Sequence, residues 1–207
     1  MTLDRKLNFI SHINNVTTKA AKVVGFIKRN TKSFKKVAAS LLLYKTLVRS
    51  ILEYSSVAWN PFYAGHSQRL ESIQRSFTRH LYWKHNRFKH RLNYNDRLTY
   101  FKLDTLSKRR KYADMIFLHN VMSGKCCIPE ILYRIKLRTP IRPPPLRRPL
   151  SNIFVLPRYR TNIGKNAPIS RLCSTYNFLN SKNFNKLDIF RFRLAQFKSH
   201  IRKCEFE

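Results

Sequence analysis

The sequence predicts a mainly α-helical fold in the form of a helical bundle. Apolar residues recur at three- and four-residue steps through several long segments, which is the period of a helix with one buried face. A hydrophobic content of 43%, with 15 Phe and 10 Tyr, can fill a core, so the composition is not that of a disordered basic tail. At 207 residues, the chain fits one domain, or a domain with a small appendage.

The clearest helical pair covers residues 37–74. Pro61 cannot continue a helix and drives Asn60 towards extended backbone, so we expect a tight corner over residues 59–65. His66 or Ser67 could cap the helix that follows. The apolar stripe of the first helix is Val37, Leu41, Tyr44, Val48 and Ile51, and that of the second is Leu70, Ile73, Phe77 and Leu81.

A short strand and another helix are predicted before this pair. Residues 2–9 alternate between apolar and polar side chains, which is typical of a strand, although a lone strand needs a partner. A helical stripe then runs from Ser11 to Asn30. Gly25 inside it costs about 1 kcal/mol relative to Ala, so we expect it to mark a close helix crossing.

The second half of the chain is less regular. We expect helices over residues 95–101 and 106–121, a short helix over 129–135, a helix over 169–179 and a last one from about Asp188. Residues 139–149 are rich in Pro and Arg and should be extended. The predicted organisation is a strand at 1–10, a helical domain at 11–124, an irregular Pro/Arg-rich linker at 125–167 and a C-terminal helical segment at 168–207. In the last helix we expect Phe190, Leu194, Phe197 and Ile201 to face inward.

The charge is far from balanced. Lys and Arg number 42 against 10 Asp and Glu, which gives a net charge of +32, whereas about 2 to 8 serves solubility in a small domain. Such self-repulsion weakens a fold unless a polyanion neutralises it. Nucleic acid is the expected partner because cations and aromatic residues are interleaved, as in residues 77–84. We expect no membrane partner, since no apolar run approaches the roughly 18 residues of a spanning helix.

Patterns of catalytic chemistry are missing. Polymerases and many nucleases hold two metal ions with clustered carboxylates, but only Glu205 and Glu207 are close together among the acids. We expect Glu53 and Glu71 to be ion-pair partners of nearby cations. The three histidines within residues 80–90 are spaced by five and do not share a helix face, and no Cys pair has zinc-ligand spacing. We therefore expect no metal, no cofactor and no enzyme activity. With no secretory signal, the expected location is the nucleus, the cytoplasm or both.

Two basic features are candidates for phosphate contact. One is the outer row of the helix after Pro61, and the other is residues 108–111 (Lys-Arg-Arg-Lys), at a helix start where the macrodipole is already positive. The row could also be a merely solvated face, and the run could be a nuclear import signal. We expect Tyr82 and Trp83 in the core. The residues that we expect to contact phosphate are Arg69, Arg75, Arg79, Lys84, Arg87, Lys108, Arg109, Arg110 and Lys111.

The order of several short motifs carries a family resemblance. They lie at residues 3–9, 43–54, 59–61, 70–77, 94–98, 106–110, 160–162 and 168–171. Together they make the chain similar to the C-terminal part of reverse transcriptases from non-LTR retrotransposons of the jockey and CR1 type. The resemblance implies the end of a polymerase palm, a helical thumb and the region beyond. The strand at residues 2–9 would then be one piece of the palm sheet.

The resemblance also implies what this chain lacks. The family's Phe/Tyr-Ala-Asp-Asp motif and its endonuclease would lie before Met1, and nothing here replaces them. A thumb grips the template-primer duplex by its backbone without reading sequence. The expected function is thus non-catalytic, sequence-tolerant binding to an RNA, DNA or hybrid duplex. The alternatives are a subunit that completes a reverse transcriptase in trans with a separate palm, and a non-functional retroelement fragment.

Overall fold

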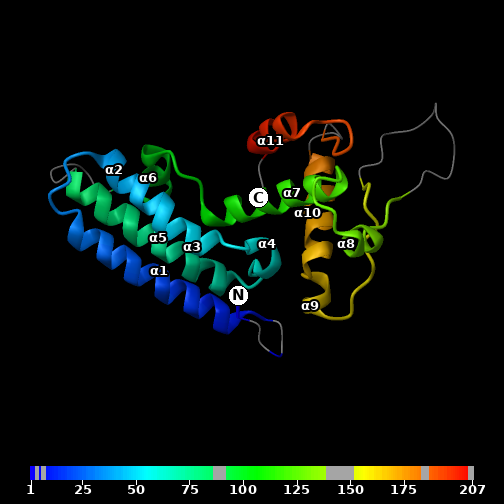
Figure 1. Cartoon of the computed structure of the whole chain (residues 1–207), viewed down its shortest axis with the longest axis horizontal. Helices are drawn as coiled ribbons and strands as arrows, with labels where there is room; N and C mark the ends of the chain where they lie inside the picture. Colours follow the sequence, from blue (N-terminus) through cyan, green and yellow to red (C-terminus); the bar gives the residue numbers. More distant parts are fainter. Residues whose placement is uncertain (3–4, 6–7, 86–91, 139–151, 183–186, 205–207) are drawn as a thin grey trace. The chain divides into compact units, whose positions relative to one another are not determined.

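The computed structural model describes residues 1–2, 5, 8–85, 92–138, 152–182 and 187–204. Helices dominate these residues, which confirms the mainly α-helical class, and no strand occurs among them beyond an isolated antiparallel bridge between Leu137 and Phe154 (Figure 1). The helices are α1 (Ile10–Asn30), α2 (Val37–Leu43), the π-helical turn η1 (Tyr44–Val48), α3 (Arg49–Glu53), α4 (Ser56–Trp59), α5 (Ala64–His85), α6 (Tyr94–Phe101), α7 (Leu106–Met122), α8 (Pro129–Arg134), α9 (Asn162–Lys165), α10 (Pro168–Lys182) and α11 (Leu194–Lys203).

The predicted strand at residues 2–9 is not supported. Thr2, Arg5, Asn8 and Phe9 are described and none of them lies in a strand, while the other residues of that range fall outside the description. Phe9 has a left-handed backbone conformation and its carbonyl accepts from the Ile13 N–H, so it starts α1. The described part of the chain contains no second strand with which these four residues could pair, and a lone strand is not stable.

The described chain divides into two compact units, Met1–Arg110 and Lys111–Glu207, and the division falls within α7. The two units are defined by contacts within the fold, whereas the predicted domains are defined by changes in composition along the sequence. The predicted domain boundaries therefore stay predictions. We describe each unit by itself.

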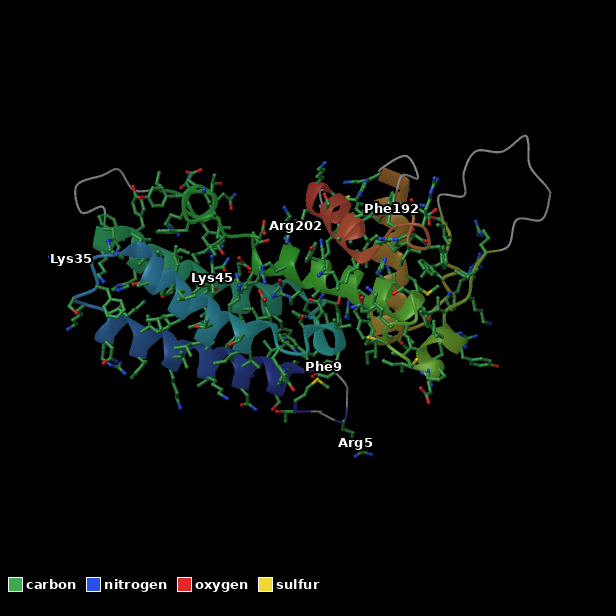
Figure 2. All side chains as sticks on the ribbon, turned by 45° about the horizontal axis from the view of Figure 1, so that its top comes forward. Arg5, Phe9, Lys35, Lys45, Phe192 and Arg202 are labelled. Carbon is green, nitrogen blue, oxygen red and sulfur yellow. The ribbon has the colours of Figure 1, made fainter. Side chains whose placement is uncertain are left out.

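Unit 1 is a bundle of α1, α5 and the continuous run α2–η1–α3, with α6 packed against α5 (Figure 1). α1 spans the unit from Phe9, just before its start, towards the loop that contains Lys35 (Figure 2). The predicted apolar stripes supply the core. Its buried residues include Ile13, Ala20, Val24, Ile27, Tyr44, Val48, Leu52, Trp59, Leu70, Phe77 and Leu81.

The corner after Trp59 forms as expected, but α5 begins at Ala64, earlier than predicted. Trp59 is buried, and its Nε1 donates to the Tyr54 carbonyl at 2.8 Å. Ser67 lies inside α5 instead of capping it, and its Oγ accepts from Arg110 Nη2 at 2.9 Å.

Gly25 does not mark a helix crossing. Among the described residues, a Cβ placed there would meet only Arg29 Nη1, at 3.5 Å, which is an ordinary contact within the same helix. The glycine therefore lowers helix propensity without allowing any close approach of a second backbone.

Unit 2 is organised around α10, which buries Leu172, Tyr176 and Leu179. Asn177 accepts from the Phe154 N–H at 3.1 Å and donates to the Phe154 carbonyl at 2.8 Å, so it ties the preceding extended segment to α10. The predicted Pro/Arg-rich segment at residues 139–149 lies outside the described residues.

The last helix, α11, starts at Leu194, later than the sequence predicts. Asp188 Oδ1 accepts from the N–H groups of Phe190 and Arg191, which closes a turn there instead of a helix. Phe190 is consequently 55% exposed, contrary to prediction, whereas Phe197 and Ile201 are buried as predicted.

Candidate nucleic-acid interface

α1 and α5 pack side by side, and both are rich in cations (Figure 1). Glu71 is the only acid in either helix. Among the described residues Glu71 forms no ion pair, contrary to prediction. Its carboxylate accepts hydrogen bonds from the Tyr94 hydroxyl and, at 3.0 Å, from the Leu106 N–H. The cations of the two helices are Lys19, Lys22, Lys28, Arg29, Arg69, Arg75, Arg79 and Lys84.

The buried side of α5 fixes which of its residues face solvent. Opposite its buried stripe, residues recur at steps of three and four and therefore lie on one face. We call this surface, together with the neighbouring polar residues of α1, the α1/α5 face. From α5 it contains Arg69, Ser72, Ser76, Arg79 and Trp83, and from α1 it contains Asn14, Thr18 and Lys28.

Trp83 belongs to this surface and not to the core. It is 44% exposed, whereas Tyr82 is buried as predicted, with its ring edge-on to Tyr100. Arg75 is exposed at the border of the α1/α5 face, where its guanidinium lies 4.9 Å from the centroid of the Tyr94 ring.

Polar contacts join the two helices across the face. Arg69 Nη1 donates to Asn14 Oδ1 at 2.7 Å, and Lys28 Nζ donates to Ser76 Oγ at 3.1 Å. A groove of about 460 Å³ runs between the helices beside Arg69. It is lined by Asn14, Thr17, Thr18, Ala21, Arg69, Ser72 and Ile73, which are mostly small and polar.

Like charges are held close together at the other end of the face. Burial lowers the pKa of Lys28, and the neighbouring Arg79 lowers it further. The pKa of His80 is also lowered, first by burial and then by the charges of Lys28 and Lys84. Lys84 donates to the Thr31 carbonyl, which fixes its ammonium beside the end of α1. A bound anion would relieve this repulsion.

The basic run at residues 108–111 is used differently. Arg109 Nη2 donates to Glu53 Oε2 at 2.8 Å, so the predicted ion-pair role of Glu53 is confirmed. That hydrogen bond is the main reason why the pKa of Arg109 is raised. Lys108 pairs with Asp104 at 3.5 Å, and Lys111 is half-buried.

Arg110 is only 1% exposed. Its Nε donates to Asn60 Oδ1 at 3.0 Å and its Nη2 donates to Ser67 Oγ. A guanidinium at this depth offers no surface to a phosphate, so we remove Arg110 from the interface. Arg87 lies outside the described residues.

Sequence reasoning missed the buried amide of Gln74. Its Nε2 donates to the Asp104 carbonyl at 2.9 Å and to the Tyr94 hydroxyl at 3.1 Å, and its Oε1 accepts from the Tyr44 hydroxyl at 2.6 Å. Burial raises the pKa of the Tyr44 phenol, which stays protonated as this donor. The amide links α5 to η1, to α6 and to the start of α7, and so holds the helix that carries Arg69 and Arg79.

Sequence reasoning also missed Lys28 and Asn14 as residues of this surface, because nothing in the sequence pairs α1 with α5. The available signal was that α1 contains no acid over 21 residues. Among the described residues, no group of three His, Cys, Asp or Glu side chains could hold a metal ion. No described helix is both long and apolar enough to cross a membrane.

Comparisons with known proteins give no match to this chain among family models, curated proteins or solved structures. The resemblance to non-LTR retrotransposon reverse transcriptases therefore stays a prediction.

Proposed function

We propose that this chain binds duplex nucleic acid by its backbone, through the α1/α5 face and without reading sequence. The observation that carries the proposal is the joining of cations from two helices into one surface, while the only acid of either helix, Glu71, is held against α6 and α7. Hydroxyl and amide side chains line the groove beside Arg69, and the Ser76 hydroxyl accepts from Lys28. Arginine, lysine, serine and asparagine are the usual donors to phosphate oxygens.

The spacing along α5 suits a nucleic-acid backbone. Arg69 and Arg79 are ten residues apart on one helix face, which is about 15 Å at the rise of an α-helix. That length matches the rise of about four nucleotides of one strand. Two helices that run side by side could thus follow one strand with several contacts.

The family resemblance gives this binding a context. We propose that the chain is a thumb-like, non-catalytic remnant of a retrotransposon RNA-directed DNA polymerase, and that the partner is an RNA, DNA or hybrid duplex. The helical bundle of unit 1 and the cations on its α1/α5 face support this proposal. A fragment without function would be expected to lack a cooperative unfolding transition.

A subunit that completes a reverse transcriptase in trans is the second candidate. It is favoured by a groove of about 440 Å³ between α1 and α3, lined in part by Val16, Ile51 and Tyr54. His12 borders this groove, and its buried Nε2 has no hydrogen-bond partner among the described residues. Primer extension by a separately expressed palm, with and without this chain, tests the idea: no gain in extension would exclude it.

The salt dependence of duplex binding tests the main proposal. Fluorescence anisotropy with labelled duplexes of unrelated sequence should give a linear fall of log K with log salt, at a slope of about −0.9 per phosphate contacted. The double variant Arg69→Glu/Arg79→Glu should bind all sequences more weakly and reduce the magnitude of the slope by about 2.

The matched control is Lys102→Glu/Lys125→Glu, which changes the net charge equally at exposed positions outside the α1/α5 face. If this control weakened binding as much as the α5 double variant, the effect would come from net charge alone and the proposed face would be wrong. A wild-type affinity that does not change with salt would overturn backbone binding altogether.

A further inference from the structure

Unit 2 contains a groove of about 640 Å³ between α8 and the start of α10. α9 lies at that same end of α10 (Figure 1). The lining residues that matter here are Tyr133, Arg134 and Lys136 from α8 and the residues after it, together with Tyr159 and Ser170. Both aromatic residues present ring surface to solvent: Tyr133 is 90% exposed and Tyr159 is 43% exposed.

The ring of Tyr159 is held in place. The buried hydroxyl of Ser170 donates to the Tyr159 hydroxyl oxygen at 2.7 Å. The ring also rests on Gly164, because a Cβ at that position would lie 2.8 Å from Tyr159 Cδ1. Such a close approach is open only to glycine. The fold thus positions an aromatic side chain that remains partly exposed.

Cations accompany the two tyrosines, in the groove and in the sequence beside Tyr159. Arg134 and Lys136 line the groove, and Arg158 and Arg160 flank Tyr159 in sequence and are exposed. The segment after α8 is fixed by paired backbone bonds, Arg138 N–H to the Ile153 carbonyl at 2.8 Å and Val155 N–H to the Lys136 carbonyl at 2.9 Å. Glu130 is the only acid within residues 128–138 and 152–170, and it does not line the groove.

We propose that this groove binds single-stranded nucleic acid, with unpaired bases stacked on Tyr133 and Tyr159 and phosphates contacted by Arg134 and Lys136. Exposed aromatic rings between cations are the usual platform for single strands, since every base has a flat face that can stack. In a duplex the base faces are covered by their neighbours, so stacking would not favour it. This site is independent of the α1/α5 face, which offers backbone contacts.

The test compares two probes of equal backbone charge on the full chain. One is an oligothymidylate of about 12 nucleotides, within the usual site size, and the other is an abasic oligomer of the same length. The wild-type chain should bind the oligothymidylate more tightly. Tyr133→Ala should weaken that binding about tenfold and leave the abasic probe unaffected, while Tyr133→Phe should keep wild-type affinity.

Gly164→Ala tests the positioning of the second ring without removing an aromatic group. Its Cβ would displace the Tyr159 ring, so the preference for bases should fall. Tyr63→Ala, at an exposed tyrosine of unit 1 that lines neither proposed groove, is the matched control and should change nothing. Arg69→Glu/Arg79→Glu should weaken duplex binding yet preserve the preference for oligothymidylate over the abasic probe, which separates this proposal from the one on duplexes.

Equal binding of both probes by the wild-type chain would overturn the proposal. So would oligothymidylate affinity that is unchanged in both Tyr133→Ala and Gly164→Ala. If Tyr133→Ala abolished binding to anionic phospholipid vesicles but not to oligothymidylate, the groove would serve a membrane surface and the proposal would be wrong.

Discussion

Replacing Gln74 with Met should destabilise unit 1 strongly while keeping the volume of the side chain similar. The Gln74 amide bonds the Tyr44 hydroxyl, the Asp104 carbonyl and the Tyr94 hydroxyl, and its side chain is completely buried. Methionine leaves the Tyr44 hydroxyl and the Asp104 carbonyl without this partner. Each unsatisfied buried group costs about 1 to 3 kcal/mol, so we expect a loss of about 2 to 5 kcal/mol.

Such a loss is a large part of the roughly 5 to 15 kcal/mol that stabilises a typical domain. Urea unfolding followed by tryptophan fluorescence measures it, since Trp59 is buried in the core of unit 1. The control is Gln68→Met, the same substitution at an exposed position of α5, which should change stability by no more than about 0.5 kcal/mol.

A double-mutant cycle with Tyr44→Phe sharpens the reasoning. In the Gln74→Met variant the Tyr44 hydroxyl has already lost its Gln74 partner. Tyr44→Phe should therefore lower the free energy of unfolding of that variant by about 1 to 3 kcal/mol less than it does in the wild-type chain. Equal stability of Gln74→Met and the wild type, or an additive cycle, would refute the view that this amide holds α5 to its neighbours.

Further predictions concern the helix interior, the basic run and pH. Gly25→Ala should stabilise the chain by about 0.5 to 1 kcal/mol in thermal unfolding, since the added Cβ meets only Arg29. Arg110→Met should destabilise unit 1 by about 2 to 4 kcal/mol, because the hydrogen bonds to Asn60 and Ser67 are lost. Lys108→Ala removes an exposed i,i+4 ion pair and should lower stability by only about 0.5 kcal/mol. Equal effects of the two substitutions on urea unfolding would contradict the buried role of Arg110. The pKa of His80 is lowered in the folded chain, so as pH falls below about 6.5 the unfolded chain binds a proton at His80 before the folded chain does. The free energy of unfolding should therefore decrease as pH falls through this range, and His80→Gln should reduce that decrease.

The helical period predicted the fold class well because it depends on local sequence. The stripe that contains Tyr44 and Val48 is buried although its middle is a π-helical turn, a feature that no apolar pattern reveals. The partners of α1 could not be predicted, since the apolar residues that pack it carry no information about which helix they meet. The strand predicted at residues 2–9 is not supported, because a strand depends on a neighbour and alternation alone does not supply one.

The candidate interface was predicted only in part, for a similar reason. In the sequence, Arg79 and Arg110 look alike, because both lie on helices that also carry an apolar stripe. In the structure Arg79 is exposed, whereas Arg110 is 1% exposed and bonds Asn60 and Ser67. The burial of a guanidinium depends on acceptors supplied from distant segments, which a single helix pattern cannot show. Arg69 and Arg79 were predictable because they lie opposite the buried stripe of their own helix.

The use of the few acids explains why a polyanion should stabilise this chain. Glu53 pairs with Arg109, Glu71 bonds the start of α7, Asp114 pairs with Arg171 in unit 2, and Asp188 closes the turn before α11. These four carboxylates are held at positions where they serve the fold. The net charge of +32 already counts every acid of the chain, so this excess of cations remains as self-repulsion. A duplex that binds the folded chain, as proposed, would remove part of that repulsion and stabilise the fold by RT ln(1 + c/Kd), where c is the free duplex concentration, so the gain grows with the logarithm of that concentration above Kd. If saturating duplex left the unfolding temperature of the chain unchanged at low salt, the excess charge would have to be offset by something other than nucleic acid.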